Sequence, residues 1–416
     1  MALDQQRQDR ILLGVAIAAA ACIHISIAAS EILLGVGIAL LLIFRQKLEF
    51  PRIWIPLAAF FLWTALADVV SPDPWGGRAQ IRKFYVFLFI PLIYGVFVRQ
   101  FSKVFYLMVA WTAAAGASGI LGLFQFYLKY QSEKTAPQGF YVAYVERRIS
   151  GFESHWMIFG ALQLSVFSLL LAHWFFSDRR MPGWVYGSLG ILSASILLGW
   201  TRSIWLAAIP STLYLVWFWR PKMTWVVPVA LVVIFLVAPA ATRERLKSLV
   251  EPRGDIDSNR FRVVTFVTGL KMIEAHPWFG VGPEEIKRNF DSYVPVEFRG
   301  PLPVGYYGHL HDMYVQYAAE RGIPGLLLIL WFISMAIWDF VQGILRAGRA
   351  RSQELFVLHG AIAVTIGVLV GGFFEYTLGH SEVLMMFVSV IALGYAALGN
   401  LHIETAFVQE SSTTAG

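Results

Sequence analysis

The residues best suited to chemistry gather in one polar interval of a largely apolar chain. This interval contains Asp257-Ser258-Asn259-Arg260-Phe261-Arg262, a helical run to His276-Pro277, Gly280-Val281-Gly282, and His309-Leu310-His311-Asp312-Met313-Tyr314. Guanidinium groups bind phosphate oxygens in a two-pronged fork and stay charged. Imidazole can be neutral at physiological pH and can then accept a proton from a reacting hydroxyl. The interval therefore predicts a site that combines anion binding with proton transfer.

Five arginines are expected to face one side of a membrane: Arg147, Arg148, Arg202, Arg260 and Arg262. Such a cluster at a membrane face is what a lipid-linked phosphate or pyrophosphate requires. Arg260 and Arg262 are separated by one residue, so a regular helix cannot direct both at the same phosphate. The alternative is that these arginines reach lipid headgroups or form ion pairs. The candidate partners for such pairs are Glu146, Asp255 and Asp257.

Two histidines, His309 and His311, lie one residue apart just before Asp312. His311 is predicted at or near the start of a helix, where the positive end of the helix dipole disfavours protonation and so favours the neutral form that a general base needs. His309 is expected on the opposite side of this helix start, in a structural role. The alternative is that both histidines are structural. Because no His/Asp/Glu set has the spacing of a zinc site, the sequence predicts neither a metal nor a cofactor.

A third group of ionisable residues lies close to the ends of the last two apolar runs. It comprises Glu375-Tyr376, His380 and Glu382. An ionisable residue in or near a membrane span is a functional candidate. Anchoring at the membrane interface explains these residues equally well.

The composition defines the class of protein. Hydrophobic residues make up 57% of the chain and charged residues only 14%, against roughly 25% charged in soluble domains. Twelve apolar runs are long enough to be membrane spans, at about 11–29, 31–45, 53–70, 84–98, 104–128, 157–176, 184–200, 203–219, 224–241, 324–345, 355–374 and 381–400. The sequence therefore predicts an all-α polytopic membrane protein. Its single cysteine, Cys22, excludes a disulfide within the chain.

Basic residues predict the orientation of these spans. Lysine and arginine concentrate before the first run and after the even-numbered runs, which places both termini in the cytoplasm by the positive-inside rule. The run at 11–29 is expected to be a retained first span, and a tight turn is expected at Gly199-Trp200-Thr201-Arg202. We thus expect nine spans in 1–241, a helical loop on the non-cytoplasmic side in 242–322, three spans in 323–402 and a cytoplasmic tail in 403–416. Membrane lipids are expected partners, and nucleic acid is not.

The polar loop is predicted to form a helical cap. Its first helix should begin near Asp257, Ser258 or Asn259 and end before Pro277, because Phe266, Val267, Leu270 and Ile273 recur at helical spacing. A second, short helix should have Pro283 in its first position, Glu284 and Glu285 in its first turn, and Lys287 and Arg288 in its last. A third should run from about His311 to Gly322, where Pro324 starts the tenth span.

Several motifs together resemble the O-antigen ligase and polymerase superfamily. They are Arg148-Ile149-Ser150-Gly151-Phe152 with His155, Thr201-Arg202-Ser203, Arg260-Phe261-Arg262 followed by His276-Pro277 and Gly280-Val281-Gly282, and His311-Asp312-Met313-Tyr314-Val315-Gln316 followed by Glu320-Arg321-Gly322-Ile323-Pro324-Gly325. Asp312 stands where that family usually has Asn. The order of the motifs, the length and the number of spans agree with the resemblance, which covers nearly the whole chain.

The resemblance implies a GT-C-like glycosyltransferase of the Gram-negative inner membrane, acting at the periplasmic face. Such proteins transfer a glycan from undecaprenyl pyrophosphate to a hydroxyl, and in the ligases the acceptor is a core sugar of lipid A-core. His311 would be the general base, with Arg262 and Arg202 stabilising the pyrophosphate. Arg260 is the alternative to Arg262 for the same role. The residues expected to bind substrate are Arg147, Arg148, His155, Arg260, His309, Asp312, Tyr314 and Glu375. The reaction is expected to be metal-independent and inverting.

Three alternatives to a ligase are open. Polymerases share the motifs, although the single dominant extracytoplasmic loop and the close spacing of the arginine and histidine motifs favour a ligase. Protein O-glycosylating relatives typically carry further C-terminal soluble sequence, whereas this chain ends about fifteen residues after the last run. A transporter or lipid flippase would use Arg202, Arg262 and Glu375 to bind an anionic substrate, but such folds usually show two similar halves, and no such symmetry is visible.

Overall fold

The computed structural model of the protein describes residues 2–251, 259–300, 308–348 and 350–414. These residues form helices and no β-strand. The α-helices are α1 Ala2–Cys22, α2 Ile27–Ile43, α3 Trp54–Val70, α4 Arg78–Lys83, α5 Phe89–Phe97, α6 Val104–Glu133, α7 Gly139–Glu146, α8 Trp156–Phe176, α9 Gly183–Leu198, α10 Arg202–Trp219, α11 Val226–Val237, α12 Ala240–Lys247, α13 Asn259–Ala275, α14 Ile286–Tyr293, α15 Met313–Ala347, α16 Gln353–Gly372 and α17 Ser381–Thr414. Short 3₁₀ turns are η1 Phe84–Leu88, η2 Phe101–Lys103, η3 Pro221–Met223, η4 Val296–Phe298 and η5 Thr377–Gly379.

Every predicted apolar run forms helix, and the all-α polytopic class is confirmed. Six helical segments within the described residues are long and apolar enough to cross a membrane: Arg78–Phe97, Phe101–Glu133, Trp156–Phe176, Met313–Ala347, Gln353–Gly372 and Ser381–Leu401. Four shorter apolar helices accompany them: Ile27–Ile43, Trp54–Val70, Gly183–Leu198 and Pro221–Val237. The count of twelve spans and the domain boundaries built on it stay predictions.

The breaks between helices follow local capping chemistry. The break between α1 and α2 falls at residues 23–26 and not near residue 30, because the Ser26 hydroxyl accepts a hydrogen bond from the Ala29 amide (3.4 Å) and begins α2 early. The predicted tight turn after α9 is confirmed. There Trp200 adopts a left-handed backbone (φ 47°) and α10 begins at Arg202.

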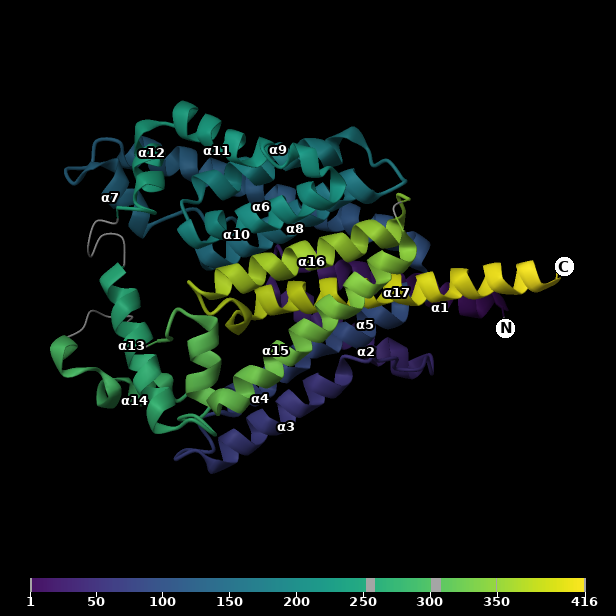
Figure 1. The fold of residues 1–416 in the computed structure, drawn as a ribbon, viewed down its shortest axis with the longest axis horizontal. Coiled ribbons are helices and arrows are strands. Elements are labelled where there is room, and N and C mark those ends of the chain that lie inside the picture. The colour runs from purple at the N-terminus through teal and green to yellow at the C-terminus, as the bar shows by residue number, and fades with distance from the viewer. Residues whose placement is uncertain (1, 252–258, 301–307, 349, 415–416) are drawn as a thin grey trace.

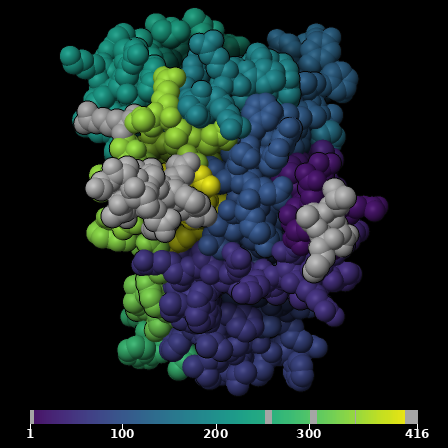
Figure 2. All heavy atoms as spheres, turned by 90° about the vertical axis from the view of Figure 1, so that its right-hand side faces the viewer, coloured from purple at the N-terminus to yellow at the C-terminus, as the bar shows by residue number. Residues whose placement is uncertain are grey.

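The long helices pack side by side around α16. This helix contacts α8, α10, α15 and α17, and the buried apolar core runs through them. Figure 1 shows α13 and α14 at one end of the molecule, whereas α1 begins and α17 ends at the other. From that second end, the teal atoms of α9 to α11 lie at the top and the dark purple atoms of α3 at the bottom (Figure 2). The polar loop therefore caps the end of the bundle away from the start of α1.

The cap has a small hydrophobic core of its own. Its buried members are Val264, Met272, Val281, Ile286, Phe290, Val294, Leu310, Val315 and Ala319. The first predicted cap helix is confirmed as α13, while the caps suggested at Asp257 and Ser258 lie outside the described residues. The predicted extent of the second helix is wrong. Gly282 (φ 109°) and Glu284 (φ 63°) are left-handed, so α14 begins only at Ile286 and places Lys287 and Arg288 in its first turn.

The third cap helix and the tenth predicted span form one kinked helix, α15. Gly322 interrupts it with φ 71° and ψ 173°. Pro324 lacks the amide hydrogen that a continuous helix needs there. The loop after α13 docks into this kink, because Val281 N donates to Ala319 O (2.8 Å) and Ile323 N donates to Pro277 O (2.8 Å). The glycine motif at 280–282 thus joins the cap to the membrane bundle.

Candidate active site

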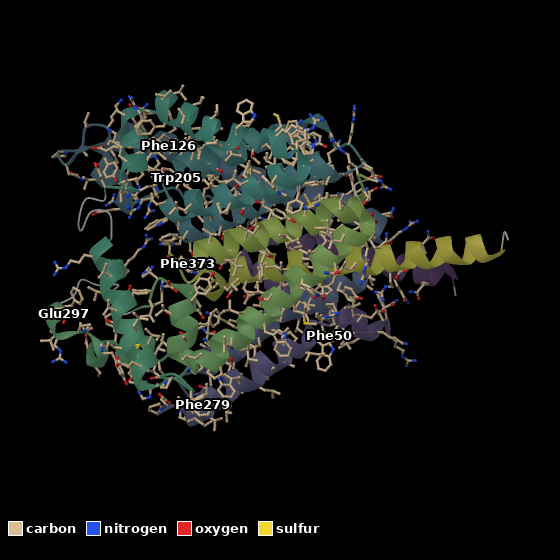
Figure 3. All side chains as sticks on the ribbon, in the orientation of Figure 1. Phe50, Phe126, Trp205, Phe279, Glu297 and Phe373 are labelled. Carbon is tan, nitrogen blue, oxygen red and sulfur yellow. The ribbon has the colours of Figure 1, made fainter. Side chains whose placement is uncertain are left out.

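A cavity of about 390 Å³ lies where α13 and the start of α15 meet the bundle. Its polar lining includes all three predicted catalytic residues, Arg202, Arg262 and His311, together with Ser203 and Asp312. The apolar lining comes from Leu206, Leu249, Val263, Phe266, Leu310, Phe373 and Phe374. Phe373 lies between α13 and the end of α16 (Figure 3). The fold therefore brings together residues that are far apart in the sequence, with charged groups beside an apolar wall.

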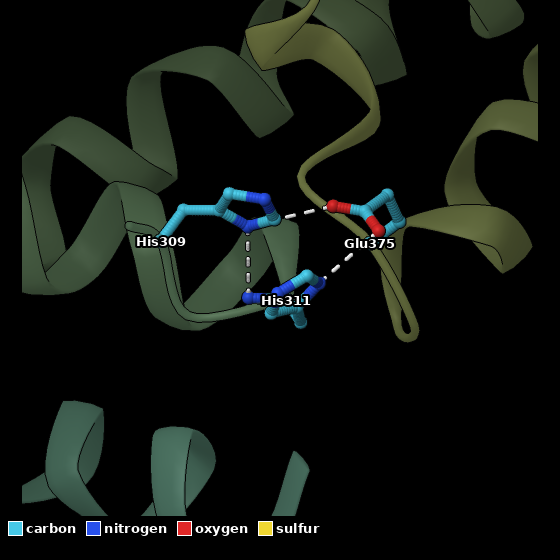
Figure 4. A group of neighbouring side chains, drawn as sticks. All are labelled: His309, His311 and Glu375. Atoms are coloured by element: carbon cyan, nitrogen blue, oxygen red, sulfur yellow. Dashed lines mark hydrogen bonds and ion pairs between the residues drawn. The ribbon is translucent and has the colours of Figure 1, made fainter. Parts of the chain in front are cut away.

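His309, His311 and Glu375 form a compact group beside this cavity (Figure 4). His311 Nδ1 lies 3.2 Å from Glu375 Oε2, and His309 Nδ1 lies 3.4 Å from Oε1 of the same carboxylate. The two imidazole rings have centroids 3.8 Å apart. The ring of Phe261 packs edge-on against His311, with centroids 4.6 Å apart. The carboxylate thus hydrogen-bonds to His311, and the His309 ring packs beside the pair.

The backbone of His311 explains how both histidines reach one carboxylate. His311 has a left-handed conformation (φ 53°), which reverses the chain just before α15. Its amide donates to His309 Nδ1 (3.3 Å). The prediction that the two histidines lie on opposite sides of a helix start is therefore wrong: both precede the helix, and Asp312 is its N-cap.

Burial and charge keep this group in a defined protonation state. Burial lowers the pKa of His309 to about 4, although Glu375 opposes the shift. Burial acts against ionisation of Glu375, but the hydrogen bond from His311 and the surrounding histidines outweigh it and lower the pKa of Glu375 to about 2. At neutral pH the carboxylate is therefore ionised and His309 is neutral. When His311 Nδ1 donates to Glu375, Nε2 is the unprotonated nitrogen of a neutral His311 ring.

The structure distinguishes between the two neighbouring arginines of α13. Arg262 lines the cavity, whereas Arg260 is exposed and is not part of the lining. The pKa of Arg262 is lowered by burial, while Glu375 opposes the shift. The expectation that one helix cannot direct both arginines to one site is confirmed.

Two further arginines, the half-buried Arg148 and the buried Arg245, bind the α9–α10 turn next to the cavity. Arg148 and Arg245 both donate to the Trp200 carbonyl, at 3.4 and 3.1 Å. Burial, followed by the fields of Arg245, Arg262 and Arg202, lowers the pKa of Arg148 well below its usual value. Four guanidinium groups thus repel one another in one region, and a bound anion would relieve that repulsion. Sequence reasoning missed Arg245, because no pattern separates it from Arg243 and Lys247 in the same short helix.

Arg202 is held by the segment that follows α12. It is buried and its Nη1 donates to the Ser248 carbonyl (2.7 Å), just after α12. Arg148 also stacks over the Trp156 ring at 4.4 Å. Arg147, in contrast, is exposed and pairs with Glu133 at 3.9 Å. Glu133 was not among the predicted acidic partners: Glu146 is exposed, and Asp255 and Asp257 lie outside the described residues.

The remaining predicted residues hold helices in place. His155 Nδ1 accepts from the Met157 amide (3.3 Å) and is the N-cap of α8, and burial lowers its pKa to about 4. Tyr314 donates to the Leu369 carbonyl (2.7 Å) and so ties α15 to α16. Asp312 Oδ1 accepts from the amides of Tyr314 and Val315, both at 2.9 Å. An asparagine oxygen could accept the same bonds, which explains how Asp replaces the usual Asn.

The histidine group could also hold a metal ion. The nearest ligand atoms of His309, His311 and Glu375 all lie within 4.8 Å of one another. However, the lone pair of His309 Nδ1 that a metal would take already accepts the His311 amide. A metal would have to break that bond, so the observed geometry fits a hydrogen-bonded histidine–carboxylate pair better.

Fold and site together define a polytopic helical membrane protein with a cationic cavity and a histidine–carboxylate pair at one end of its bundle. Residues 187–330 match the family model described as O-antigen ligase. This match confirms the resemblance to the O-antigen ligase superfamily, whose members are ligases or polymerases. The matched segment contains Arg202, Arg262 and His311, whereas Arg148 and Glu375 lie outside it. A search of curated proteins finds no match to the chain.

Proposed function

We propose that this protein is an O-antigen ligase. It transfers O-antigen polysaccharide from undecaprenyl pyrophosphate to a sugar hydroxyl of lipid A-core, at the periplasmic face of the Gram-negative inner membrane. The single observation that carries this proposal is the shared cavity in which the buried Arg202, the half-buried Arg262 and a carboxylate-bound histidine meet. Cations suit the departing pyrophosphate and a neutral histidine suits deprotonation of the acceptor hydroxyl, which are the two tasks of glycosyl transfer from a lipid-linked pyrophosphate.

The arginines would act on the leaving group. As the bond between the anomeric carbon and the pyrophosphate oxygen breaks, negative charge grows on that oxygen. Arg262 and Arg202 line the cavity where this charge would develop. Fixed cations at such a place stabilise the transition state, because they need no reorganisation during the reaction. Arg148 and Arg245 lie close to these two arginines and add to the positive electrostatic potential.

His311 would act on the acceptor. Its Nε2 takes the proton of the sugar hydroxyl as the oxygen attacks the anomeric carbon, and the pyrophosphate leaves with the bonding electron pair. Glu375 fixes the orientation of the ring and stabilises the imidazolium that forms, as carboxylates do for other catalytic histidines. A direct attack of this kind inverts the anomeric centre and requires no metal.

The decisive experiment is reconstitution. Purified protein, lipid-linked O-antigen and lipid A-core should yield joined polysaccharide, seen on a gel as a shift of the lipid A-core band. Transfer onto a second lipid-linked repeat would indicate a polymerase. Movement of the lipid-linked glycan between leaflets, with no covalent product, would indicate a flippase. Either result would replace the ligase proposal.

A further inference from the structure

A second cavity, of about 490 Å³, lies at the far end of α13 from the candidate active site. Its lining comes from the end of α3, the loop between α13 and α14, and α14 itself. Phe266 lines the first cavity and Ala275 lines the second. At a rise of 1.5 Å per residue, these two residues lie roughly 13 Å apart along the axis of α13. Figure 3 shows Phe373 near the upper end of α13 and Phe279 beside its lower end.

The lining of the second cavity is aromatic and uncharged. It includes Trp278, Phe279 and Tyr293 with His276, Asn289 and Ser71, and none of its described residues is Lys, Arg, Asp or Glu. The first cavity, in contrast, carries Arg202, Arg262 and Asp312. Because a phosphate would meet no guanidinium or ammonium in the second cavity, this lining suits a neutral ligand.

The polar groups of the lining suit a ligand with many hydroxyls. His276 Nε2 and the Tyr293 hydroxyl are hydrogen-bonded at 2.6 Å. The Asn289 side chain, anchored by a 2.9 Å bond to the Glu285 carbonyl, carries an amide that can both donate and accept. Trp278 is 68% exposed beside them. Pyranose rings present one apolar C–H face, which packs on aromatic rings, and a rim of hydroxyls, which hydrogen-bond to such amides and phenols.

The cavity is also rigidly held. Phe279 stacks on Trp63 with centroids 5.2 Å apart and an interplanar angle of 13°. The loop that carries Trp278 is bonded to α15 at the kink, and a Cβ at Gly322 would lie only 1.9 Å from the Trp278 carbonyl oxygen. A preformed site loses little conformational entropy when its ligand binds.

We propose that this second cavity is a carbohydrate-binding subsite for the glycan chain of the donor. The inference rests on the proposed function: with the pyrophosphate at Arg262 and Arg202, sugars of the chain that extend along α13 reach Trp278, Tyr293 and Asn289. The subsite would hold the long polysaccharide while its reducing end reacts.

Kinetics of the full-length protein in detergent test this proposal. Trp278→Ala should raise the KM for donors with many repeat units roughly tenfold, about 1.4 kcal/mol and the scale of one aromatic contact. A donor with one repeat unit should show an unchanged KM. Trp75→Ala is the matched control, because Trp75 is 70% exposed in a loop at the same end and lines neither cavity. If the KM effect instead depends on the length of the acceptor core, the donor assignment is wrong. The cavity would then bind carbohydrate of the acceptor.

Two outcomes would overturn the subsite. One is an equal loss with short and long substrates. The other is an unchanged KM with all substrates. This outcome includes the case in which Trp278 is only a membrane anchor, so that Trp278→Ala lowers Tm in lipid nanodiscs and Trp278→Phe restores it.

A binding assay separates this inference from the proposed function. Free O-antigen polysaccharide, released from its lipid, should bind wild-type protein and bind Trp278→Ala about tenfold more weakly even if no transfer is detected. If transfer occurs while this polysaccharide does not bind, the subsite alone is wrong.

Discussion

His311 has a backbone conformation that is rare outside glycine. A left-handed φ in a histidine costs free energy and persists only where surrounding contacts hold it. Here the Asp312 cap, the Glu375 carboxylate and the His309 ring provide those contacts. The same turn directs two imidazoles to one carboxylate. A base whose ring is fixed in this way is ready to accept a proton without reorganisation.

Replacing His311 by alanine should lower transfer by roughly 10²–10⁴-fold, the usual contribution of a general base. Lipid-linked donor should still bind, because the arginines remain. Initial rates of transfer and donor binding, measured on the wild type and the variant, provide the check.

Two other variants serve as controls for His311. Glu375→Gln retains the shape of the side chain but not its charge, and should give a smaller loss than His311→Ala. His309→Ala should also be milder. If His309 proved essential and His311 dispensable, the base would have to be reassigned to His309.

Arg262 and Arg260 offer a matched comparison on one helix. Arg262→Ala should abolish detectable transfer, since a hydrogen-bonded charge pair with phosphate contributes about 1.5–3 kcal/mol before any additional transition-state effect. Arg262→Lys should rescue poorly, because lysine lacks the planar fork. Arg260→Ala should retain most activity, because this residue is exposed and outside the cavity lining. Equal rates for the two alanine variants would remove Arg262 from the mechanism.

The histidine group makes metal independence a testable point. Transfer should survive treatment with EDTA, because the His311 amide already uses the His309 lone pair that a metal would need. The measurement is the transfer rate before and after chelation and desalting. Loss of activity that added divalent cations restore would mean that His309, His311 and Glu375 bind a metal ion.

At the scale of elements, the kink in α15 determines where the cap lies. Two buried groups support it: the Arg321 carbonyl accepts from Trp63 Nε1 (2.8 Å), and the Arg321 side chain pairs with Glu320. The kink lets the first part of α15 pack against α13 while the rest continues through the bundle (Figure 1). The two cavities therefore keep their spacing only while this junction is intact.

Gly322→Ala should destabilise the junction strongly. The residue has φ 71°, and a Cβ would lie 1.9 Å from the Trp278 carbonyl oxygen, which is backbone and cannot rotate away. With ψ at 173°, this backbone conformation is one that essentially only glycine adopts, and it costs other residues about 1–3 kcal/mol. We expect a lower Tm in detergent and a lower yield of folded protein.

Gly190→Ala in α9 is the matched control for this variant. A Cβ there meets nothing within 4 Å, so its Tm should match or exceed that of the wild type. Similar Tm values for the two variants would show that the kink does not hold the cap.

At the scale of the whole molecule, partly buried neutral histidines predict how stability depends on pH. His155 and His309 have folded-state pKa values lowered to about 4, below the ordinary value of about 6.5. Between these values the unfolded chain binds protons that the folded protein does not, so stability should fall as pH drops from about 6.5 to 4. The slope should approach 1.4 kcal/mol per pH unit for each histidine. Glu375 adds its own loss only as pH falls from about 4.5 towards 2.

Thermal unfolding in detergent across this pH range provides the measurement. The double variant His155→Asn and His309→Gln should show a shallower decline between pH 6.5 and 4, because it lacks both titrating groups. Asparagine at 155 can still cap α8. A Tm that is constant over this range in the wild type would contradict the buried neutral state of these histidines.

The sequence by itself determined the membrane class, the helical elements and the motifs. A composition of 57% hydrophobic and 14% charged residues, together with long apolar runs, indicates a membrane protein, and prolines and glycines mark helix limits through local chemistry. It also identified His311, Arg202 and Arg262, which line one cavity. The predictions of class and helices succeeded because they depend on composition or on short-range rules, whereas the catalytic roles of these three residues stay predictions.

Only the tertiary structure decided which side chains meet. Glu375 lies 64 residues after His311 in the chain, and no periodicity links them. Arg148 and Arg245 both donate to the Trp200 carbonyl, although helices α8 to α11 lie between them in the sequence. The start of α14 was misjudged because Gly282 and Glu284 adopt left-handed conformations at the docking contact with α15, which local helix signals do not encode. Contacts between distant segments depend on packing of the whole bundle, and helix periodicity carries no information about them.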